Sequence, residues 1–389
     1  GRQGGTEQGG ASWVRRPEST DQPRAAFRPK GCEWRESLRF PAECPRRLET
    51  AEHRALSDGL RFDPPKHGHP VLDEAWRMRE KTLRAAGQRS GVTGASTDAA
   101  TPPRGFRHLL AAPWFYRLGF AAARRVPLAA LYGIADVLAL ATYLSCRAQA
   151  RTLRGNLLRL LPEASGAARA RLARRICRNY ARYLVDYGRF RWMPGGGFEA
   201  VITGLEGGEH LRRAFAMERG VILVTGHVGN WELGGVFFGH RGVKVHVVTL
   251  PDGSRQIDAI RQMYRGRHAV NTIVLDGSPF APLEMMAALR RREMVAMLVD
   301  RWGKTDGVAA AFLGGTQYLP RGPFALGLAT GAPILPAFVI RDGGTYRGIV
   351  EPPILVEQDD FAPYAARVSD ALERVIRRCP DQWYNFVAV

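Results

Sequence analysis

The stretch GVILVTGHVGNWELGG, from Gly220 to Gly235, decides how this chain is expected to fold. It opens with the apolar run Val221–Val224, which is typical of a strand buried on both faces. Asn230 is a good helix N-cap, so a helix is expected to begin at Trp231. A strand, a glycine-flanked turn and a helix in this order are typical of an α/β protein whose ligand site lies beyond the carboxyl end of the strand.

Two side chains in and after the turn suggest chemistry. His227 and Glu232 are five positions apart, and on one helix they would lie roughly 140° apart at about 100° per residue. Gly226 and Gly229 permit a bend. We therefore expect Glu232 to point back at the imidazole, fix its tautomer and stabilise its protonated form, which makes His227 a candidate general base. The alternative is a turn histidine satisfied by the backbone, with Glu232 as an ordinary acid of the first helical turn.

The charge of the chain points to an anionic partner. Its 389 residues carry a formal net charge of +19 and a pI near 10.4, in an otherwise ordinary globular composition. Nucleic acid, an anionic membrane surface and an acidic protein all satisfy that charge. The five cysteines are odd in number, widely spaced and in no CxxC arrangement, so we expect neither a disulfide framework nor a metal site, and a reducing compartment is the simplest interpretation.

The chain divides near residue 104. Residues 1–104 are rich in Arg, Pro, Gly, Ser and Thr and lack a sustained period, so we expect a disordered or poorly ordered extension there. Residues 105–389 are expected to form the folded domain. The apolar run 126–146, VPLAALYGIADVLALATYLSC, is long enough to cross a bilayer, although Asp136 near its middle costs roughly 2.5 to 3.5 kcal/mol on insertion. A membrane anchor, spanning or interfacial, and a buried helix of the domain both remain open.

A basic segment follows that run. From Arg147 to Arg191 there are 12 arginines against two acidic residues. Apolar residues recur every three or four positions within it, so a helix there has one apolar stripe beside a basic face. Such a helix lies at a membrane interface or packs on the core with its arginines in solvent.

After Gly204 the pattern alternates between short apolar runs and helical stretches. This order predicts an α/β fold with a mixed, partly parallel sheet flanked by helices. The expected strands are 221–224, 243–250, 272–275, 294–299 and 334–340, and the expected helices are 209–217, 231–238, 256–265, 282–291, 323–329 and 364–378.

Three stretches resemble a known family. The string GHVGNWELGG is similar to the His-x4-acid block of glycerolipid acyltransferases, in the form used by the bacterial lipid A biosynthesis acyltransferases. The downstream string VAMLVDRWGKTDGVAAAFLGGTQYLPRGPFALGLATGAPILPAF resembles a second block of that family. RGNLLRLLP, with Asn156, Leu157 and Pro162, resembles a short upstream signature. The resemblance covers roughly residues 115–385 and implies a glycerolipid acyltransferase-like fold with a membrane-associated helix at its start.

The resemblance also implies site residues. Asp300 falls on the acidic position of the second block, and Arg265 matches an arginine that faces the active-site groove in relatives. Arg301 stands where Gln is more usual, and Arg321 where a small hydroxyl residue is common. We expect the three arginines to bind phosphates of a lipid head group, with Asp300 and Asn230 also at the substrate site. The alternative is a purely structural role, in which the arginines are surface residues and Asp300 caps a turn.

The implied activity is direct acyl transfer. His227 would take a proton from a hydroxyl of a lipid A precursor or related glycolipid, and that oxygen would attack the thioester of an acyl carrier protein or acyl-CoA. Backbone amides in the turn after His227 would stabilise the oxyanion, and no cofactor is required. The expected partners are this donor, the lipid acceptor and an anionic membrane surface. The expected location is the cytoplasmic face of the bacterial inner membrane.

Two other classes of protein remain open. A basic nucleic-acid-binding protein explains the net charge but not the apolar run, and the chain lacks the interleaved aromatic and basic motifs of the known modules. A non-catalytic membrane scaffold of the same fold explains both. It predicts that His227→Ala and Glu232→Ala change nothing.

Overall fold

A seven-stranded sheet lies at the centre of the part of the chain that this computed structural model describes, residues 113–190, 193, 197–251, 255–302 and 306–389. The predictions for residues 1–104 lie outside the described residues. The strand order is β1-β9-β8-β2-β5-β3-β4, and a separate antiparallel hairpin is formed by β6 and β7. The strands are β1 (Ile202–Glu206), β2 (Val221–Thr225), β3 (Val245–Thr249), β4 (Val270–Val274), β5 (Met294–Leu298), β6 (Val308–Phe312), β7 (Gly315–Leu319), β8 (Ile334–Asp342) and β9 (Thr345–Val350).

The sheet is mixed, as the sequence predicts. Strands β8, β2, β5, β3 and β4 are parallel to their neighbours in that order, whereas β9 pairs antiparallel with β8 and parallel with β1. All five residues of β2 are buried. Their side chains alternate between two apolar clusters, with Ile222 and Val224 in one and Val221 and Leu223 in the other, so the sheet is covered on both faces.

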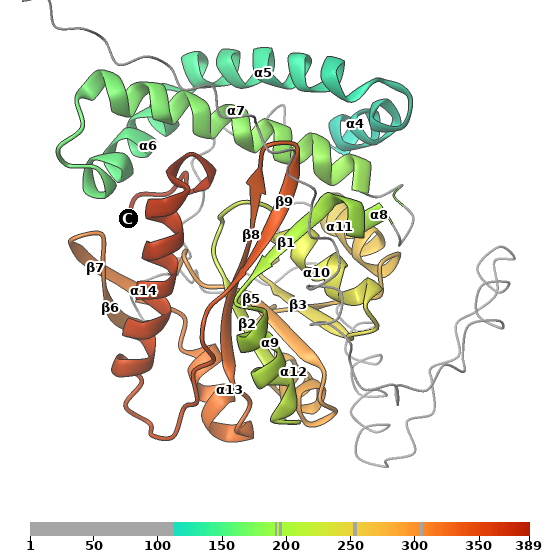
Figure 1. Cartoon of the computed structure of the whole chain (residues 1–389), viewed down its shortest axis with the longest axis vertical. Coiled ribbons are helices and arrows are strands. Elements are labelled where there is room, and N and C mark those ends of the chain that lie inside the picture. The colour runs from blue at the N-terminus through green and yellow to red at the C-terminus, as the bar shows by residue number, and fades with distance from the viewer. Residues whose placement is uncertain (1–112, 191–192, 194–196, 252–254, 303–305) are drawn as a thin grey trace, which may run out of the picture.

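Helices supply the two covering layers (Figure 1). Helices α6, α7, α12, α13 and α14 contribute to the cluster on one face, and α8, α9, α10, α11 and the end of α7 contribute to the cluster on the other. The helices are α4 (Pro113–Arg125), α5 (Leu128–Ser145), α6 (Arg147–Leu160), α7 (Gly166–Phe190), α8 (Gly197–Val201), α9 (Gly208–Ala216), α10 (Trp231–His240), α11 (Arg255–Gly266), α12 (Phe280–Arg290), α13 (Gly322–Thr330) and α14 (Ala362–Arg378), followed by the 3-10 turn η2 (Pro380–Gln382).

The apolar run 126–146 forms helix α5, which lies alongside α7 at one end of the molecule (Figure 1). It is the one helix among the described residues that is long and apolar enough to cross a membrane. Only Leu131, Ala135 and Ala139 of α5 are buried. The run is therefore a surface helix docked on the domain, and the alternative of a buried core helix is wrong.

Candidate active site

Residues 226–230 connect β2 to α10, and we call them the catalytic turn because they carry the candidate base His227. Gly229 has φ +62°, and a Cβ there would lie 2.1 Å from the carbonyl oxygen of Val339. A Cβ on Gly226 would lie 2.8 Å from the Leu372 side chain. The turn therefore needs glycine at position 229, and a side chain at position 226 would require Leu372 to shift. The Asn230 side chain accepts a hydrogen bond from the Leu233 amide at 3.0 Å, so it caps α10 as predicted.

His227 is paired with Asp300. The Nδ1 of His227 lies 2.6 Å from one oxygen of the Asp300 carboxylate, and the backbone N–H of His227 donates to the other at 2.9 Å. The sheet register explains this pairing. Thr225 of β2 lies beside Leu298 of β5, and His227 and Asp300 each follow two residues beyond those partners at the same edge of the sheet. Asp300 thus holds His227 with Nε2 as the nitrogen that can accept a proton from a substrate.

The predicted contact between Glu232 and His227 is wrong. Both oxygens of the Glu232 carboxylate accept from Arg265, at 2.6 Å from Nη2 and 3.1 Å from Nε. Glu232 is the second residue of α10, and its side chain is directed at α11 rather than back along the turn. Both partners are buried. The pair links α10 to α11, both residues line the pocket described below, and the charge of Arg265 is balanced by Glu232.

Burial favours the neutral form of His227. Burial lowers the pKa of His227 below its ordinary value, and this effect outweighs the opposing influence of Asp300. Burial alone would raise the pKa of Asp300, but the contacts with His227 outweigh it and the pKa lies below its usual range. For Glu232 the pairing with Arg265 likewise outweighs burial and lowers the pKa. A neutral imidazole beside an ionised carboxylate is the state that a general base requires.

Arg261 is a positive charge near His227 that the sequence interpretation did not single out. It lies four residues, about one turn, before Arg265 on α11 and is half-buried. Besides burial, its positive charge contributes to lowering the pKa of His227, as does that of Arg301. The helical spacing from Arg265 could have indicated it.

The other predicted substrate residues have different positions. Arg301 lies beside the site and donates to the Tyr384 carbonyl. The guanidinium of Arg321 lies 4.7 Å from the Phe361 ring centroid. Phe361 immediately precedes the first residue of α14. Tyr384, which lies after the last residue of α14, is hydrogen-bonded to His227 in the catalytic turn. A helix of 17 residues is about 25 Å long, so the structure does not bring Arg321 to His227. Asn230 is buried as a cap rather than exposed to a substrate.

The amides expected to form an oxyanion hole are partly occupied. The Gly229 amide donates to the Gln382 carbonyl at 3.0 Å, and the Asn230 amide to the Val339 carbonyl at 2.7 Å. These two amides of the turn are therefore engaged within the protein.

Aromatic side chains surround His227. Its ring lies 5.1 Å from that of Trp231, which stacks on Tyr183 of α7 at 4.7 Å. Tyr384 lies near both Trp231 and Tyr183, at 6.3 and 6.0 Å between ring centroids. These rings connect the catalytic turn to α7 and to the segment after α14.

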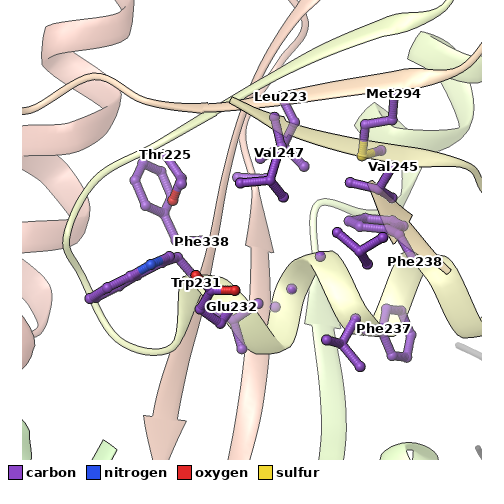
Figure 2. A pocket seen from close by; sticks show the side chains of 18 of the residues that line it. Leu223, Thr225, Trp231, Glu232, Phe237, Phe238, Val245, Val247, Met294 and Phe338 are labelled. Atoms are coloured by element: carbon purple, nitrogen blue, oxygen red, sulfur yellow. The ribbon is translucent and has the colours of Figure 1, made fainter. Parts of the chain in front are cut away.

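An apolar pocket lies between α10 and the sheet. Its cavity volume is about 70 Å³. Trp231 and Glu232 lie toward one end, and Phe237 and Phe238 toward the other (Figure 2). Gly234 and Gly235 line it from the helix, and the absence of side chains there keeps the space open. The walls come from Leu223, Val245, Val247, Met294, Ala296 and Val339. This lining suits an apolar ligand.

Comparison with known proteins identifies the family. The model of the family described as bacterial lipid A biosynthesis acyltransferase matches residues 103–387. The chain belongs to that family. A phosphatidylinositol mannoside acyltransferase of Mycobacterium tuberculosis (strain CDC 1551 / Oshkosh) is 27% identical over 303 residues, which cover 76% of this chain and 89% of the relative. That of Mycolicibacterium smegmatis (strain ATCC 700084 / mc(2)155) is 24% identical over 272 residues, or 69% of this chain and 88% of the relative.

This lipid A biosynthesis acyltransferase family member is therefore an O-acyltransferase, and its family and relatives place it among the acyltransferases of glycolipids. Such an enzyme takes a lipid acceptor and an acyl donor. The interpretations as a scaffold without activity and as a nucleic-acid-binding protein are not supported.

Proposed function

We propose that this enzyme transfers a fatty acyl chain from an acyl thioester, carried by acyl carrier protein or coenzyme A, to a sugar hydroxyl of an anionic glycolipid. The observation that carries the proposal is the His227–Asp300 pair, in which His227 follows two residues after Thr225, a residue that lines the apolar pocket. Between the two acceptor classes, the relatives favour a mannosylated phosphatidylinositol over a lipid A precursor, because they are named for it.

The reaction follows from the geometry of this pair. Nε2 of His227 takes the proton of the acceptor hydroxyl, and the oxygen forms a bond to the thioester carbonyl carbon. Asp300, at Nδ1, stabilises the imidazolium that forms. The tetrahedral intermediate expels the thiolate, the carbon–sulfur bond breaks, and the imidazolium returns its proton to the sulfur. No residue of the enzyme is acylated, and His227 is neutral again at the end.

The pocket under α10 is the proposed site of the acyl chain. Its walls are almost wholly apolar, as an acyl chain requires, and it reaches from Trp231 toward the starts of the strands. The first turn of α10 brings the thioester end toward the catalytic turn. Arg261 and Arg301, whose charges act on His227, are the proposed contacts for negative charge on the acceptor or the oxyanion.

Helix α5 is the proposed membrane contact, and we propose that it lies along the membrane surface rather than across it. Asp136 accepts two hydrogen bonds from Arg182 of α7, at 2.8 and 2.5 Å, and the Tyr132 hydroxyl donates to Asp186 at 2.6 Å. A helix crossing the bilayer would lose these contacts and carry Asp136 into hydrocarbon. The opposite face exposes large apolar side chains that suit the acyl region of a lipid interface: Ile134, Val137, Leu138, Leu140 and Leu144.

The proposed compartment is the cytoplasmic face of the bacterial inner membrane. Cys146, Cys177 and Cys379, the cysteines within the described residues, are free thiols, which suits a reducing environment. The exposed arginines near the ends of α5, Arg125 and Arg147, suit an anionic leaflet.

Comparison of lipids tests this function. Mass spectrometry of lipid extracts from a strain with and without the gene should reveal a glycolipid that differs by one acyl chain. Complementation with the wild-type gene should restore the acylated species, and the His227→Ala gene should not. An unchanged lipid profile, with the protein well expressed, would refute the proposal.

A further inference from the structure

The segment after α14 forms the outer support of the catalytic turn. The Tyr384 amide donates to the His227 carbonyl at 2.8 Å, and the Gly229 amide donates to the Gln382 carbonyl at 3.0 Å. These bonds make an antiparallel bridge between Val228 and Trp383. The turn thus pairs with residues 382–384 on one side, while Asp300 contacts it on the other.

Together these contacts fix most of His227. Asp300 accepts from the backbone N–H of His227 and contacts its Nδ1, and Tyr384 donates to its carbonyl. Three of its four polar groups are therefore committed to the protein, which leaves Nε2 for the substrate. Loss of the Tyr384 contact would free the backbone on the carboxyl side of His227.

The supporting segment is itself held in place. Trp383 is buried against Phe312 at 6.0 Å between ring centroids. The Gln382 side chain exchanges two hydrogen bonds with the backbone of Arg341, at 2.7 and 2.8 Å. Arg301 donates to the Tyr384 carbonyl, which gives this arginine a role at the turn besides its charge.

The side chain of Asn156 on α6 forms hydrogen bonds with residues 385–389. Its amide nitrogen donates to the carbonyls of Asn385 at 3.1 Å and Val387 at 2.8 Å, and its amide oxygen accepts from the Val389 amide at 3.2 Å. Asn156 is 3% exposed, and residue 385 is buried beside it. One side chain with two donors and one acceptor thus ties residues 385–389 to the helix. Only an amide side chain of this length supplies both kinds of group here.

We propose that residues 382–389 are a clamp that positions His227, and that Asn156 is a positioning residue acting through this clamp. Asn156 contacts neither His227 nor the pocket. It binds residues 385–389 by hydrogen bonds. These residues position Tyr384, whose amide donates to the carbonyl of His227. The inference rests on the proposed function, because it assigns a kinetic role to the contact.

A double-mutant cycle tests the clamp. We expect Asn156→Ala to lower kcat about 10- to 100-fold per folded enzyme, the order expected when a reacting group is displaced by about 1 Å, with little change in KM. Removal of residues 385–389 should have a similar effect. Because both changes break the same contacts, Asn156→Ala in the shortened chain should cost at most a further twofold. Multiplication of the two effects would overturn the proposal, and so would wild-type kcat in Asn156→Ala.

Gln149→Ala is the matched control, since Gln149 is also buried and lies two turns earlier on α6. It should leave kcat per folded enzyme within about twofold of wild type. Hydrogen exchange supplies a readout that needs no substrate: the Gly229 and Tyr384 amides should exchange faster in Asn156→Ala but not in Gln149→Ala. Unchanged exchange would overturn the clamp even if acyl transfer is observed, whereas faster exchange in a protein that acylates no glycolipid would refute the proposed function alone.

Discussion

Asp300→Asn and Glu232→Gln separate the roles of two carboxylates, of which Asp300 pairs with His227 and Glu232 pairs with Arg265. Asp300 contacts Nδ1 of His227, whereas Glu232 forms an ion pair with Arg265. Two unit charges about 4 Å apart interact by about 4 kcal/mol at an effective dielectric constant near 20. We take this interaction energy as the stabilisation that Asp300 gives to the imidazolium. Because about 1.4 kcal/mol corresponds to a factor of ten in rate, Asp300→Asn should lower kcat roughly 10³-fold.

Glu232→Gln should act mainly on stability. It leaves the Arg265 guanidinium buried without a counter-charge, and breaking a buried pair from one side costs about 3–5 kcal/mol. We expect a lower melting temperature and a loss of kcat of at most about tenfold in the folded fraction. The double variant Glu232→Gln/Arg265→Gln should recover part of the stability, because no uncompensated charge remains.

The assay is acyl transfer under single-turnover conditions, with the folded fraction of each variant measured separately. The account requires Asp300→Asn to be the slower enzyme and Glu232→Gln the less stable one. If the order is reversed, with Glu232→Gln about 10³-fold slower and Asp300→Asn close to wild type, the pairing of His227 with Asp300 does not operate in catalysis.

Three further predictions concern the acid limb of the pH profile, the pocket and the membrane. Burial lowers the pKa of His227, so kcat/KM should fall only below pH about 6.5. Arg261→Gln removes a positive charge that lowers this pKa, so the fall in kcat/KM should begin at a higher pH. If the pH profile does not change, Arg261 lies outside the site. A Cβ on Gly235 would lie 3.8 Å from Val247, so Gly235→Ala should be tolerated. Gly235→Leu should lower kcat/KM for donors with long acyl chains at least about tenfold and affect donors with short chains less. Equal effects on all donors would mean that the pocket does not hold the acyl chain. Val137→Glu should weaken binding to vesicles of phosphatidylcholine and phosphatidylglycerol about tenfold or more. Leu355→Glu, on the loop between β9 and α14, is the control. Equal binding of the two variants would refute the membrane role of α5.

The elements with a clear period were predictable from the sequence. The apolar run of β2, the capped start of α10 and the amphipathic helix α14 all lie within a few residues of their expected positions. Strands β1, β6, β7 and β9 were not predicted. They are short and contain glycine, alanine or polar residues, and β1 and the β6–β7 hairpin lie at or outside the edge of the sheet. Their pairing depends on tertiary contacts rather than on a local pattern.

The site was predictable only where its residues are local. The turn between β2 and α10 and its histidine follow from glycine positions and a helix cap. The partner of His227 does not, because Asp300 reaches it through the pairing of β2 with β5, 73 residues later in the chain. Local spacing favoured Glu232 instead. The arginines were assigned by resemblance alone, and the structure shows that Arg265 is already held by an acidic side chain.

Acyl transfer by the purified enzyme in mixed micelles tests the central claim most directly. The acceptors are a mannosylated phosphatidylinositol and a lipid A precursor, each offered with acyl-CoA and with acylated carrier protein, and the product is measured by mass spectrometry. The account predicts addition of one ester-linked acyl chain, preferentially to the mannosylated lipid, and a fall of at least about 100-fold in the His227→Ala enzyme. An equal rate of acyl transfer by folded His227→Ala would contradict the assignment of His227 as the base.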